Sequence, residues 1–391
     1  MSMLRNAPRD IVVVGNGIAG LTACDTLRAE GFDGQITVIG DEPIAPYSRP
    51  ALSKALLRDG DDLTSHLLPE ATHGAIERRG TAAISLDVDR QRVQLADGDE
   101  VPYDALVIAT GTRAKRLGQG NRSDEYTVRT LADALALRVR LASRPSVVVV
   151  GGGPLGMEIA SGAVGAGCPT TLVTKGVPLV SQLGALLAAR FRDAALTQGL
   201  TIVTADSAKI VTRDGTSVVA LGDGSIIEAE VMVSAIGDAP NVEWLATSGL
   251  LIDGSLVVDK RGLVRPNIAA AGDVAAFPHD GRIARVPLWT SAIDQARVAA
   301  AALLRPDAPE LAFQQYFWTE AFGISLKAIG PMPVAGEAEI VEGTGERGVL
   351  RWHQAGGSAT AVALNYRVPI PKLRRMTVFN SNGGRLLLEK P

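Results

Sequence analysis

The chain has 391 residues, about 2.5 times a common domain size, which predicts two or three domains. Apolar residues make up 46% and charged residues 21%, a globular balance that excludes a disordered or fibrous chain. The net charge of −3, from 39 basic and 42 acidic residues, gives no basic excess that would draw the whole chain to nucleic acid.

The N-terminal segment does not read as a signal peptide. Its first ten residues include Arg5, Arg9 and Asp10 and contain no apolar run. No apolar stretch approaches the roughly 20 residues that a membrane-spanning helix needs. We therefore expect a cytoplasmic protein that makes no use of a membrane.

The two cysteines, Cys24 and Cys168, lie far apart in the sequence. Neither belongs to a C-x-x-C pair, so neither a redox-active dithiol nor a metal site is expected. Both are interpreted as small buried side chains.

One pattern occurs twice along the chain. The β-branched runs 10–14 and 146–150 each lead directly into a G-x-G-x-x-G sequence. A helical pattern follows each, at 21–28 and 157–164, and then a second strand at 35–39 and 170–173. Strand, turn, helix and strand in this order define the context in which the glycine motif is informative.

The glycines of this motif have separate physical tasks. The first makes a tight turn, the second lets the backbone approach a pyrophosphate, and the third lets helix and strand pack closely. The phosphates then sit at a helix N-terminus, which favours negative charge. The motif glycines are Gly15, Gly17 and Gly20 in the first copy and Gly151, Gly153 and Gly156 in the second.

Two such motifs predict two dinucleotides, most naturally a tightly held flavin and a transient nicotinamide between which a hydride passes. Asp41 and Glu42 follow the second strand of the first copy, where an acid bonds a ribose hydroxyl. The first copy also carries the loop Pro-Tyr-Ser-Arg-Pro-Ala-Leu-Ser-Lys at 46–54, which the second copy lacks.

That loop resembles the ferredoxin and rubredoxin reductases that feed bacterial oxygenases and cytochromes P450. Further segments resemble the same family in order along nearly the whole chain. They are 103–111, 128–134, 235–241, 270–275 and 316–320. The resemblance implies FAD, NADH or NADPH, and an iron–sulfur ferredoxin as partner.

The resemblance also implies the architecture. We expect an α/β protein with two Rossmann-like domains, the second inserted in the first, and a C-terminal α+β domain. The FAD domain is expected at 1–113 and 240–312, the nicotinamide domain at 114–239, and the C-terminal domain at 313–391. Short β-branched runs around 361–363 and 377–378 indicate strands in the last of these.

Matching the family's motifs residue by residue gives candidate binding sites. For FAD they are Gly15, Gly17, Ala19, Gly20, Asp41, Glu42, Arg49, Lys54, Ala83, Ala109, Thr110, Gly111, Arg129, Gly272, Asp273 and Trp289. For the nicotinamide cofactor they are Gly151, Gly153, Leu155, Gly156, Glu158, Thr174, Lys175 and Gly237.

Three residues are expected to serve catalysis. The resemblance places Lys54 near flavin N5, where a fixed cation favours hydride acceptance; the alternative is a solvated surface loop. It places Glu158 near the nicotinamide; the alternative is an acid that favours the helix dipole. It places Trp318 at the flavin edge; the alternative is a core tryptophan. For Asp273, which would bond the ribityl chain, a helix N-cap is a compatible alternative.

Two departures from the family pattern stand out. Pro287 replaces the acid of the Trp289 segment and has no N–H to donate, which puts contacts to the flavin pyrimidine edge in doubt. Thr174 replaces the acid that ends the second strand of the nicotinamide motif, and Lys175 follows it. Losing that acid removes a bias against NADPH, and Lys175 offers a point charge for its extra phosphate.

Charge is unevenly spread. Residues 351–391 hold seven basic groups and one acid, a balance of 7 − 1 = +6. The basic residues are Arg351, Arg367, Lys372, Arg374, Arg375, Arg385 and Lys390. Such a surface would steer an acidic ferredoxin, or would simply be solvated.

Three functions remain open at this point. The first is an NAD(P)H-dependent ferredoxin reductase, acting as a monomer or homodimer. The second is a flavoenzyme that reduces a small molecule or oxygen directly. The third is a redox-sensing flavoprotein with weakened nicotinamide use, against which the intact second glycine motif and Glu158 argue.

Overall fold

The protein is described from a computed structural model that covers residues 8–54, 57, 66–118, 125–213, 216–279, 282–312, 314–354 and 358–377. The chain divides into two compact units, each described by itself below. Unit 1 comprises Met1–Leu52, Asp61–Lys115 and Gly237–Phe313. Unit 2 comprises Ser53–Gly60, Arg116–Ile236 and Gln314–Pro391.

Unit 1 is built on a six-stranded sheet with the order β19-β20-β7-β1-β2-β3. All neighbours are parallel except the β19–β20 pair. The strands are β1 (Asp10–Val14), β2 (Gln35–Gly40), β3 (Ile76–Arg79), β7 (Ala105–Ile108), β19 (Leu263–Arg265) and β20 (Ile268–Ala270). Because β1, β2, β7 and β20 are buried on both faces, their sequences are continuous apolar runs rather than alternating ones.

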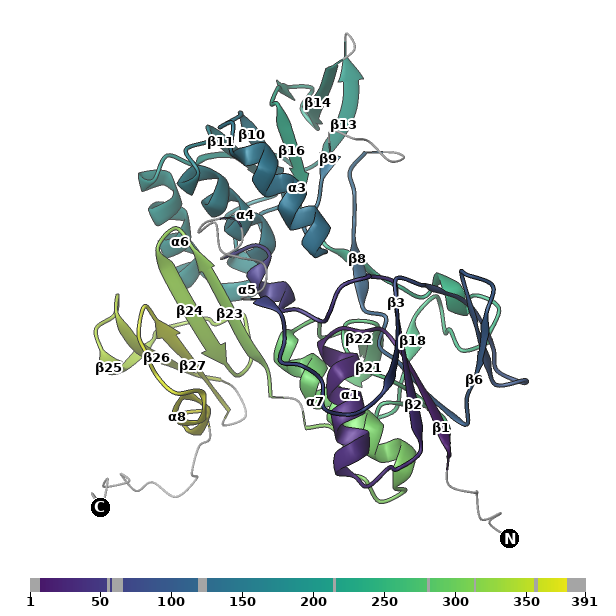
Figure 1. Cartoon of the computed structure of the whole chain (residues 1–391). Helices are drawn as coiled ribbons and strands as arrows, with labels where there is room; N and C mark the ends of the chain where they lie inside the picture. The colour runs from purple at the N-terminus through teal and green to yellow at the C-terminus, as the bar shows by residue number, and fades with distance from the viewer. Residues whose placement is uncertain are drawn as a thin grey trace, which may run out of the picture. The chain divides into compact units, whose positions relative to one another are not determined.

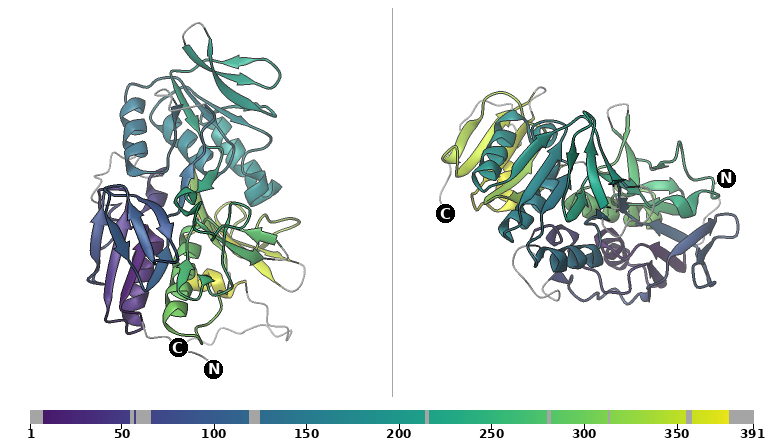
Figure 2. Two further views of the ribbon diagram at one scale, coloured as in Figure 1. Left: turned by 90° about the vertical axis from the view of Figure 1, so that its right-hand side faces the viewer. Right: turned by 90° about the horizontal axis from the view of Figure 1, so that it is seen from above.

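Successive residues of β1 point to opposite faces and enter two different cores. Ile11 and Val13 pack against the helices α1 (Ile18–Ala29) and α7 (Trp289–Leu304). Val12 and Val14 pack on the other face, together with residues of the strands that cover it. Figures 1 and 2 show α1 and α7 side by side, and the two helices are in contact.

Smaller elements complete unit 1. One three-stranded sheet holds β4 (Ala83–Asp87), β5 (Arg92–Leu95) and β6 (Glu100–Pro102). Another holds β18 (Leu256–Val257), β21 (Ala275–His279) and β22 (Arg282–Ala284). A two-stranded ribbon pairs β8 (Thr112–Ala114) with β17 (Asp238–Pro240), and single turns of 3-10 helix lie at Arg49–Ala51 and Glu243–Leu245.

Unit 2 repeats the parallel architecture in a sheet with the order β12-β11-β10-β16-β9. Its strands are β9 (Glu125–Tyr126), β10 (Val147–Val150), β11 (Thr170–Thr174), β12 (Thr201–Thr204) and β16 (Val231–Ser234). Its helices are α3 (Leu131–Leu141), α4 (Pro154–Gly165), α5 (Val180–Leu183) and α6 (Ala185–Thr197). The antiparallel strands β13 (Ala208–Arg213), β14 (Thr216–Leu221) and β15 (Ile226–Ile227) cover one face of this sheet.

Unit 2 also contains a five-stranded antiparallel sheet with the order β23-β24-β27-β26-β25. Its strands are β23 (Tyr316–Ala321), β24 (Ile324–Ile329), β25 (Glu339–Gly343), β26 (Gly348–His353) and β27 (Ala359–Leu364). The short helix α8 (Ile370–Arg375) packs through Leu373 on one face of this sheet. Strand β23 contacts α4, so the other face meets the second parallel domain.

The predicted fold class is confirmed: the chain has two parallel α/β domains, one inserted in the other, and an antiparallel sheet with a helix. The strand expected around 361–363 is present as β27. The strand expected at 377–378 is wrong for Thr377, because α8 precedes it and the Thr377 hydroxyl donates back to the Arg374 carbonyl. Val378 lies outside the described residues.

The described residues contain no helix with both the length and the apolar character needed to cross a membrane.

Candidate dinucleotide and redox site

The two glycine motifs have the same local geometry. Gly15 and Gly151 adopt φ values of 118° and 128°, in the region that favours glycine. A Cβ on Gly15 would lie 2.1 Å from the Ala109 carbonyl oxygen, and one on Gly151 would lie 2.2 Å from the Ala235 carbonyl oxygen. Only glycine therefore fits these turns.

The third glycine of each motif permits the close packing of helix and strand. A Cβ on Gly20 would lie 1.9 Å from the Gly15 carbonyl oxygen. The corresponding distance from Gly156 to the Gly151 carbonyl oxygen is 1.8 Å. Both copies thus form the turn that the sequence predicts for a dinucleotide-binding motif.

The middle glycines differ because they face open space. Gly17 and Gly153 are the N-cap residues of α1 and α4, and neither helix has a side-chain cap. A Cβ on either glycine would meet no atom within 4 Å. Each helix therefore presents its N-terminal N–H groups to a region that a pyrophosphate fits.

A buried side-chain amide near the first glycine motif has a spare hydrogen-bond donor, as expected beside a cofactor site. Gln295 is 1% exposed, and its Oε1 accepts a hydrogen bond from the Gly272 backbone at 2.8 Å. Its Nε2 has no hydrogen-bond partner among the described residues. Gly272 in turn packs close to Ala19 at the start of α1, so the spare donor lies by the predicted FAD residues.

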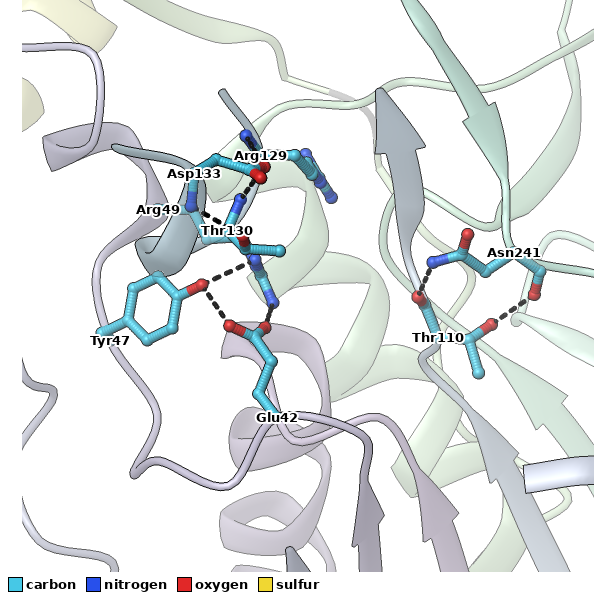
Figure 3. Close-up of polar contacts among 8 residues, drawn as sticks. All are labelled: Glu42, Tyr47, Arg49, Thr110, Arg129, Thr130, Asp133 and Asn241. Atoms are coloured by element: carbon cyan, nitrogen blue, oxygen red, sulfur yellow. Dashed lines mark hydrogen bonds and ion pairs between the residues drawn. The ribbon is translucent and has the colours of Figure 1, made fainter. Parts of the chain in front are cut away.

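The acidic residues after β2 have distinct surroundings. Glu42 accepts hydrogen bonds from Tyr47 Oη at 2.6 Å and Arg49 Nη2 at 2.5 Å, and Arg49 Nη1 donates to Tyr47 Oη at 2.9 Å (Figure 3). This triad fixes the Arg49 guanidinium. Asp41 is exposed, so of the two predicted ribose ligands its carboxylate is the more accessible.

Thr110 follows β7 and is hydrogen-bonded to Asn241, which follows β17. Its hydroxyl donates to the Asn241 carbonyl at 2.8 Å, and Asn241 Nδ2 donates to the Thr110 carbonyl at 2.9 Å (Figure 3). Gly111 beside it has a φ of 63°. The predicted FAD residues Ala109, Thr110 and Gly111 thus lie at the carboxyl end of a parallel strand, where nucleotides bind in such sheets.

Asp273 lies in a turn between β20 and β21, and its carbonyl accepts a hydrogen bond from Arg285. Arg285 also pairs with Asp238 at 2.6 Å. No described helix begins at Asp273, so the N-cap alternative for this residue is wrong. Its half-buried carboxylate stays a predicted ribityl ligand.

Of four further predicted residues, two lie in secondary-structure elements and two lie in loops. Ala83 begins β4 in unit 1, and Trp289 is the first residue of α7. Gly237 lies in unit 1, where its carbonyl accepts a hydrogen bond from the Lys115 backbone. Arg129 lies in unit 2 just before α3, where Thr130 and Asp133 form a capping box (Figure 3).

Glu158 is the centre of a buried polar cluster in unit 2. Its side chain is 5% exposed. Lys54 Nζ lies 3.0 Å from each of its carboxylate oxygens. Ser53 Oγ donates to Oε2 at 2.5 Å, and Thr319 Oγ1 donates to Oε1 at 2.6 Å. We call Ser53, Lys54, Glu158, Trp318 and Thr319 the Glu158 cluster.

The cluster brings together the three predicted catalytic residues. Lys54 Nζ also lies 5.2 Å from the centroid of the Trp318 ring, a cation–π distance. The Lys54 side chain is only 12% exposed, so it is not part of a solvated loop. Glu158 is the fifth residue of α4 rather than a first-turn acid, so the helix-dipole alternative does not describe it.

Sequence reasoning missed Ser53 and Thr319. Each lies next to a residue that was singled out, in the loop before Lys54 and in the strand after Trp318. A buried carboxylate can accept hydrogen bonds from several donors. The hydroxyl groups of Ser53 and Thr319, next to Lys54 and Trp318, were the only sequence signal for these contacts. Only the tertiary structure shows that the Ser53 loop and strand β23, which packs on α4, bring these donors to Glu158.

The predicted nicotinamide-specificity residues lie at the end of β11. Thr174 is buried, and its Oγ1 would lie 2.2 Å from a Cβ on Gly152. Lys175 is exposed. Arg190, the next basic residue along the chain, donates from its guanidinium to the Gly345 carbonyl.

Residues 9–299 match the family model described as pyridine nucleotide-disulphide oxidoreductase, and the chain belongs to this family of oxidoreductases. It is 35% identical over 353 residues to rhodocoxin reductase of Rhodococcus erythropolis, which covers 87% of this chain and 82% of the relative. It is 33% identical over 338 residues to the ferredoxin–NAD(+) reductase component of the p-cumate 2,3-dioxygenase system of Pseudomonas putida, covering 82% and 81%.

The fold also matches a solved structure of a reductase with its partner. The chain superposes on the reductase of the covalent putidaredoxin reductase–putidaredoxin complex with a TM-score of 0.82 and 28% identity. The match covers 95% of this chain and 93% of that one. The resemblance inferred from the sequence motifs is therefore confirmed.

Proposed function

We propose that this chain is an FAD-dependent NAD(P)H:ferredoxin reductase that supplies electrons to an oxygenase or a cytochrome P450. The observation that carries the proposal is the pair of glycine turns of identical geometry, each with an uncapped helix N-terminus facing open space. Two such sites suit FAD and a nicotinamide dinucleotide. The named activities of the relatives support the ferredoxin as acceptor.

The proposal assigns FAD to 1–113 and 240–312, the nicotinamide cofactor to 114–239, and the partner interface to 313–391. FAD, when bound, supplies the capacity to take two electrons as a hydride and to release them singly. The chain's own residues bind and orient the two cofactors. Gly17 and Gly153 leave room for the two pyrophosphates, and the Lys54 ammonium would supply a fixed positive charge that favours hydride transfer.

Glu158 positions that charge. Four donor contacts from three side chains saturate its two oxygens, so the carboxylate and the Lys54 ammonium hold each other in one orientation. Fixed charges of this kind stabilise developing charge without reorganising during the reaction. Trp318 lies over the same ammonium and would shield the reacting centre from water.

The proposal includes NADPH as well as NADH. No acidic residue lies between Thr170 and Arg192, so a 2′-phosphate at the end of β11 would meet no carboxylate from this stretch. Lys175 is exposed there and carries a positive charge. We expect kcat/KM for the two cofactors to differ by less than about 30-fold, since a lysine contact contributes about 1–2 kcal/mol.

The test is an anaerobic titration of the FAD-loaded protein with NADH and, separately, with NADPH. Stoichiometric bleaching of the flavin band by either is expected, and Lys54→Met should slow it by about 10–100-fold. Lys209→Met, at an exposed lysine of β13, is the matched control. If dithionite bleaches the flavin but neither nicotinamide does, the reductase proposal fails and a redox-sensing flavoprotein remains.

A second assay separates the acceptors. Reduction of cytochrome c that requires added putidaredoxin supports a ferredoxin reductase. Equal rates of NADH oxidation with and without putidaredoxin, accompanied by oxygen consumption, would instead identify a flavoenzyme that acts directly on small molecules or oxygen.

A further inference from the structure

Two hydroxyl groups, on Ser53 and Thr319, complete the hydrogen bonding of the Glu158 carboxylate. Ser53 Oγ donates to Glu158 Oε2 at 2.5 Å, and Thr319 Oγ1 donates to Oε1 at 2.6 Å. Each carboxylate oxygen thus accepts one hydroxyl and shares the Lys54 ammonium, which lies 3.0 Å from both. Hydrogen bonds to an ionised acceptor are about twice as strong as those between neutral groups, so both hydroxyls are firmly held.

The carboxylate has no acceptor position to spare. An ionised carboxyl group offers about four lone-pair sites on its two oxygens. Among the described residues four contacts fill them, two from the ammonium and two from the hydroxyls. Glu158 is buried, so water does not readily replace a lost donor. A nicotinamide carboxamide could bind this carboxylate only by displacing one of the present donors.

Thr319 is held in place by its strand. It is fully buried in β23, and a β-branched side chain has a restricted χ1, so its hydroxyl has little freedom to turn away. Three residues further along both elements, the Phe322 N–H donates to Ser161 Oγ at 2.8 Å. Residues three apart share one face of a helix, so the end of β23 is attached to α4 at two successive points.

Ser53 fastens the loop that carries Lys54. It precedes Lys54 in the sequence and is itself buried. Its hydrogen bond to Glu158 therefore ties the chain beside the lysine to the same carboxylate that receives the ammonium. The last torsion of a glutamate side chain has a broad energy profile. Without the two hydroxyls the carboxylate could rotate, and the ammonium would no longer be held between both oxygens.

We propose that Thr319 and Ser53 are positioning residues for hydride transfer, which hold Glu158 in the orientation that fixes the Lys54 ammonium. The inference rests on the proposed function, in which that ammonium favours hydride transfer. It adds two residues and a division of tasks. The hydroxyls and Glu158 set the rate of the transfer, whereas the N-terminus of α4 binds the cofactor. The antiparallel sheet, through Thr319, therefore contributes to the nicotinamide half-reaction.

The test removes one hydroxyl at a time from the full-length, FAD-loaded protein. Thr319→Val keeps the shape of the side chain and deletes the donor, and Thr319→Ser keeps the donor. Thr360→Val is the matched control, because Thr360 is equally buried in β27 of the same sheet and its hydroxyl donates at 2.5 Å to the Pro331 carbonyl. Ser53→Ala tests the second donor and replaces Thr319→Val if that variant does not fold.

Anaerobic stopped-flow reduction over a range of NADH concentrations separates the limiting rate constant from the apparent Kd. We expect Thr319→Val and Ser53→Ala each to lower the limiting rate constant about 10-fold, with the apparent Kd unchanged within about 2-fold. Thr319→Ser should stay within about 3-fold of the wild type, since only its χ1 is freer. Thr360→Val should match the wild type.

A redox titration with dithionite and reference dyes supplies a readout that does not depend on nicotinamide. The flavin midpoint potential should fall in Thr319→Val and Ser53→Ala but not in Thr360→Val. The reason is that a cation held less firmly stabilises the reduced flavin less.

An equal loss of rate in Thr360→Val would overturn the proposal, because it would trace the effect to general loosening of the sheet. A weaker affinity for NADH with an unchanged limiting rate constant in Thr319→Val would overturn it too, since the cluster would then bind the nicotinamide. If neither nicotinamide reduces the wild type, the proposed function fails, and the midpoint potential still decides the positioning role. Equal potentials in Thr319→Val and the wild type would overturn that role, and a lower potential in the variant would support it.

Discussion

Lys54 Nζ lies 3.0 Å from both carboxylate oxygens of Glu158, although 104 residues separate the two in sequence. Both side chains are largely buried, so each charge depends on the other for compensation. Ser53 and Thr319 donate to the same carboxylate. Removing one charge therefore leaves the other buried with fewer partners.

A double-mutant cycle should show this dependence. We expect Glu158→Gln and Lys54→Met each to lower the free energy of unfolding by about 2–4 kcal/mol, and the double variant to cost less than the sum. Denaturant unfolding of the four FAD-loaded proteins measures the coupling. Additive costs would show that the two charges do not depend on each other.

Replacing glycine by alanine at two positions of the second glycine motif should affect different properties, cofactor binding at one position and stability at the other. Gly153→Ala places a methyl group in open space in front of α4, so stability should hold while the KM for NADH rises about 10-fold or more. Gly151→Ala should destabilise by about 2 kcal/mol or more, because its Cβ would lie 2.2 Å from the Ala235 carbonyl oxygen. Thermal unfolding and steady-state kinetics check both, and a Gly153→Ala protein with an unchanged KM would contradict the assignment.

Restoring an acid at the end of β11 should change the cofactor preference. Thr174→Glu is expected to lower kcat/KM for NADPH by about 10–100-fold relative to NADH, through repulsion of the 2′-phosphate. Lys175→Ala should lower the NADPH value alone by about 3–10-fold, because it removes only a point charge. The measurement is the ratio of kcat/KM for NADPH to kcat/KM for NADH. This ratio should fall in both variants.

The hairpin that carries Trp318 is tethered to the parallel domain at Phe322. The Phe322 N–H donates to Ser161 Oγ of α4, and Gln198 Nε2, just after α6, donates to the Phe322 carbonyl, both at 2.8 Å. Phe322 is buried and has a φ of 52°, a conformation that costs about 1–2 kcal/mol and needs such support.

We expect Ser161→Ala/Gln198→Ala to speed hydrogen exchange in 316–329 by about 10-fold, because the tethers no longer hold the turn. Exchange in 348–364, on β26 and β27 of the same sheet, serves as the internal control. Equal acceleration in both segments would indicate general destabilisation of the sheet rather than release of the hairpin.

Neither cysteine should react in the folded protein. Burial raises the pKa of the Cys24 thiol to about 12 and raises that of Cys168 above its usual range, so the reactive thiolate is scarce at neutral pH. A chromogenic disulfide reagent should label fewer than about 0.2 thiols per native chain and two in denaturant. Rapid labelling of the native protein at pH 7 would contradict this.

The sequence alone determined the features that depend on local order along the chain. The two glycine motifs specify their turns because Gly15 and Gly151 need positive φ and Gly20 and Gly156 need close backbone approach, and each requirement is met within about ten residues. The continuous apolar runs at 11–14 and 147–150 likewise predict strands buried on both faces. The family resemblance followed from the same local motifs.

Only the tertiary structure decided which side chains meet. The Glu158 cluster joins residues from a loop, a helix and a strand that lie more than 100 positions apart, and no periodicity in the sequence encodes those contacts. The same holds for the surface charges, because ion pairs with Glu339 and Glu342 neutralise Arg351 and Lys372. Of the basic set predicted from residues 351–391, Arg385 and Lys390 lie outside the described residues. Charge counts along a sequence give the total charge, whereas packing decides which charges remain unpaired.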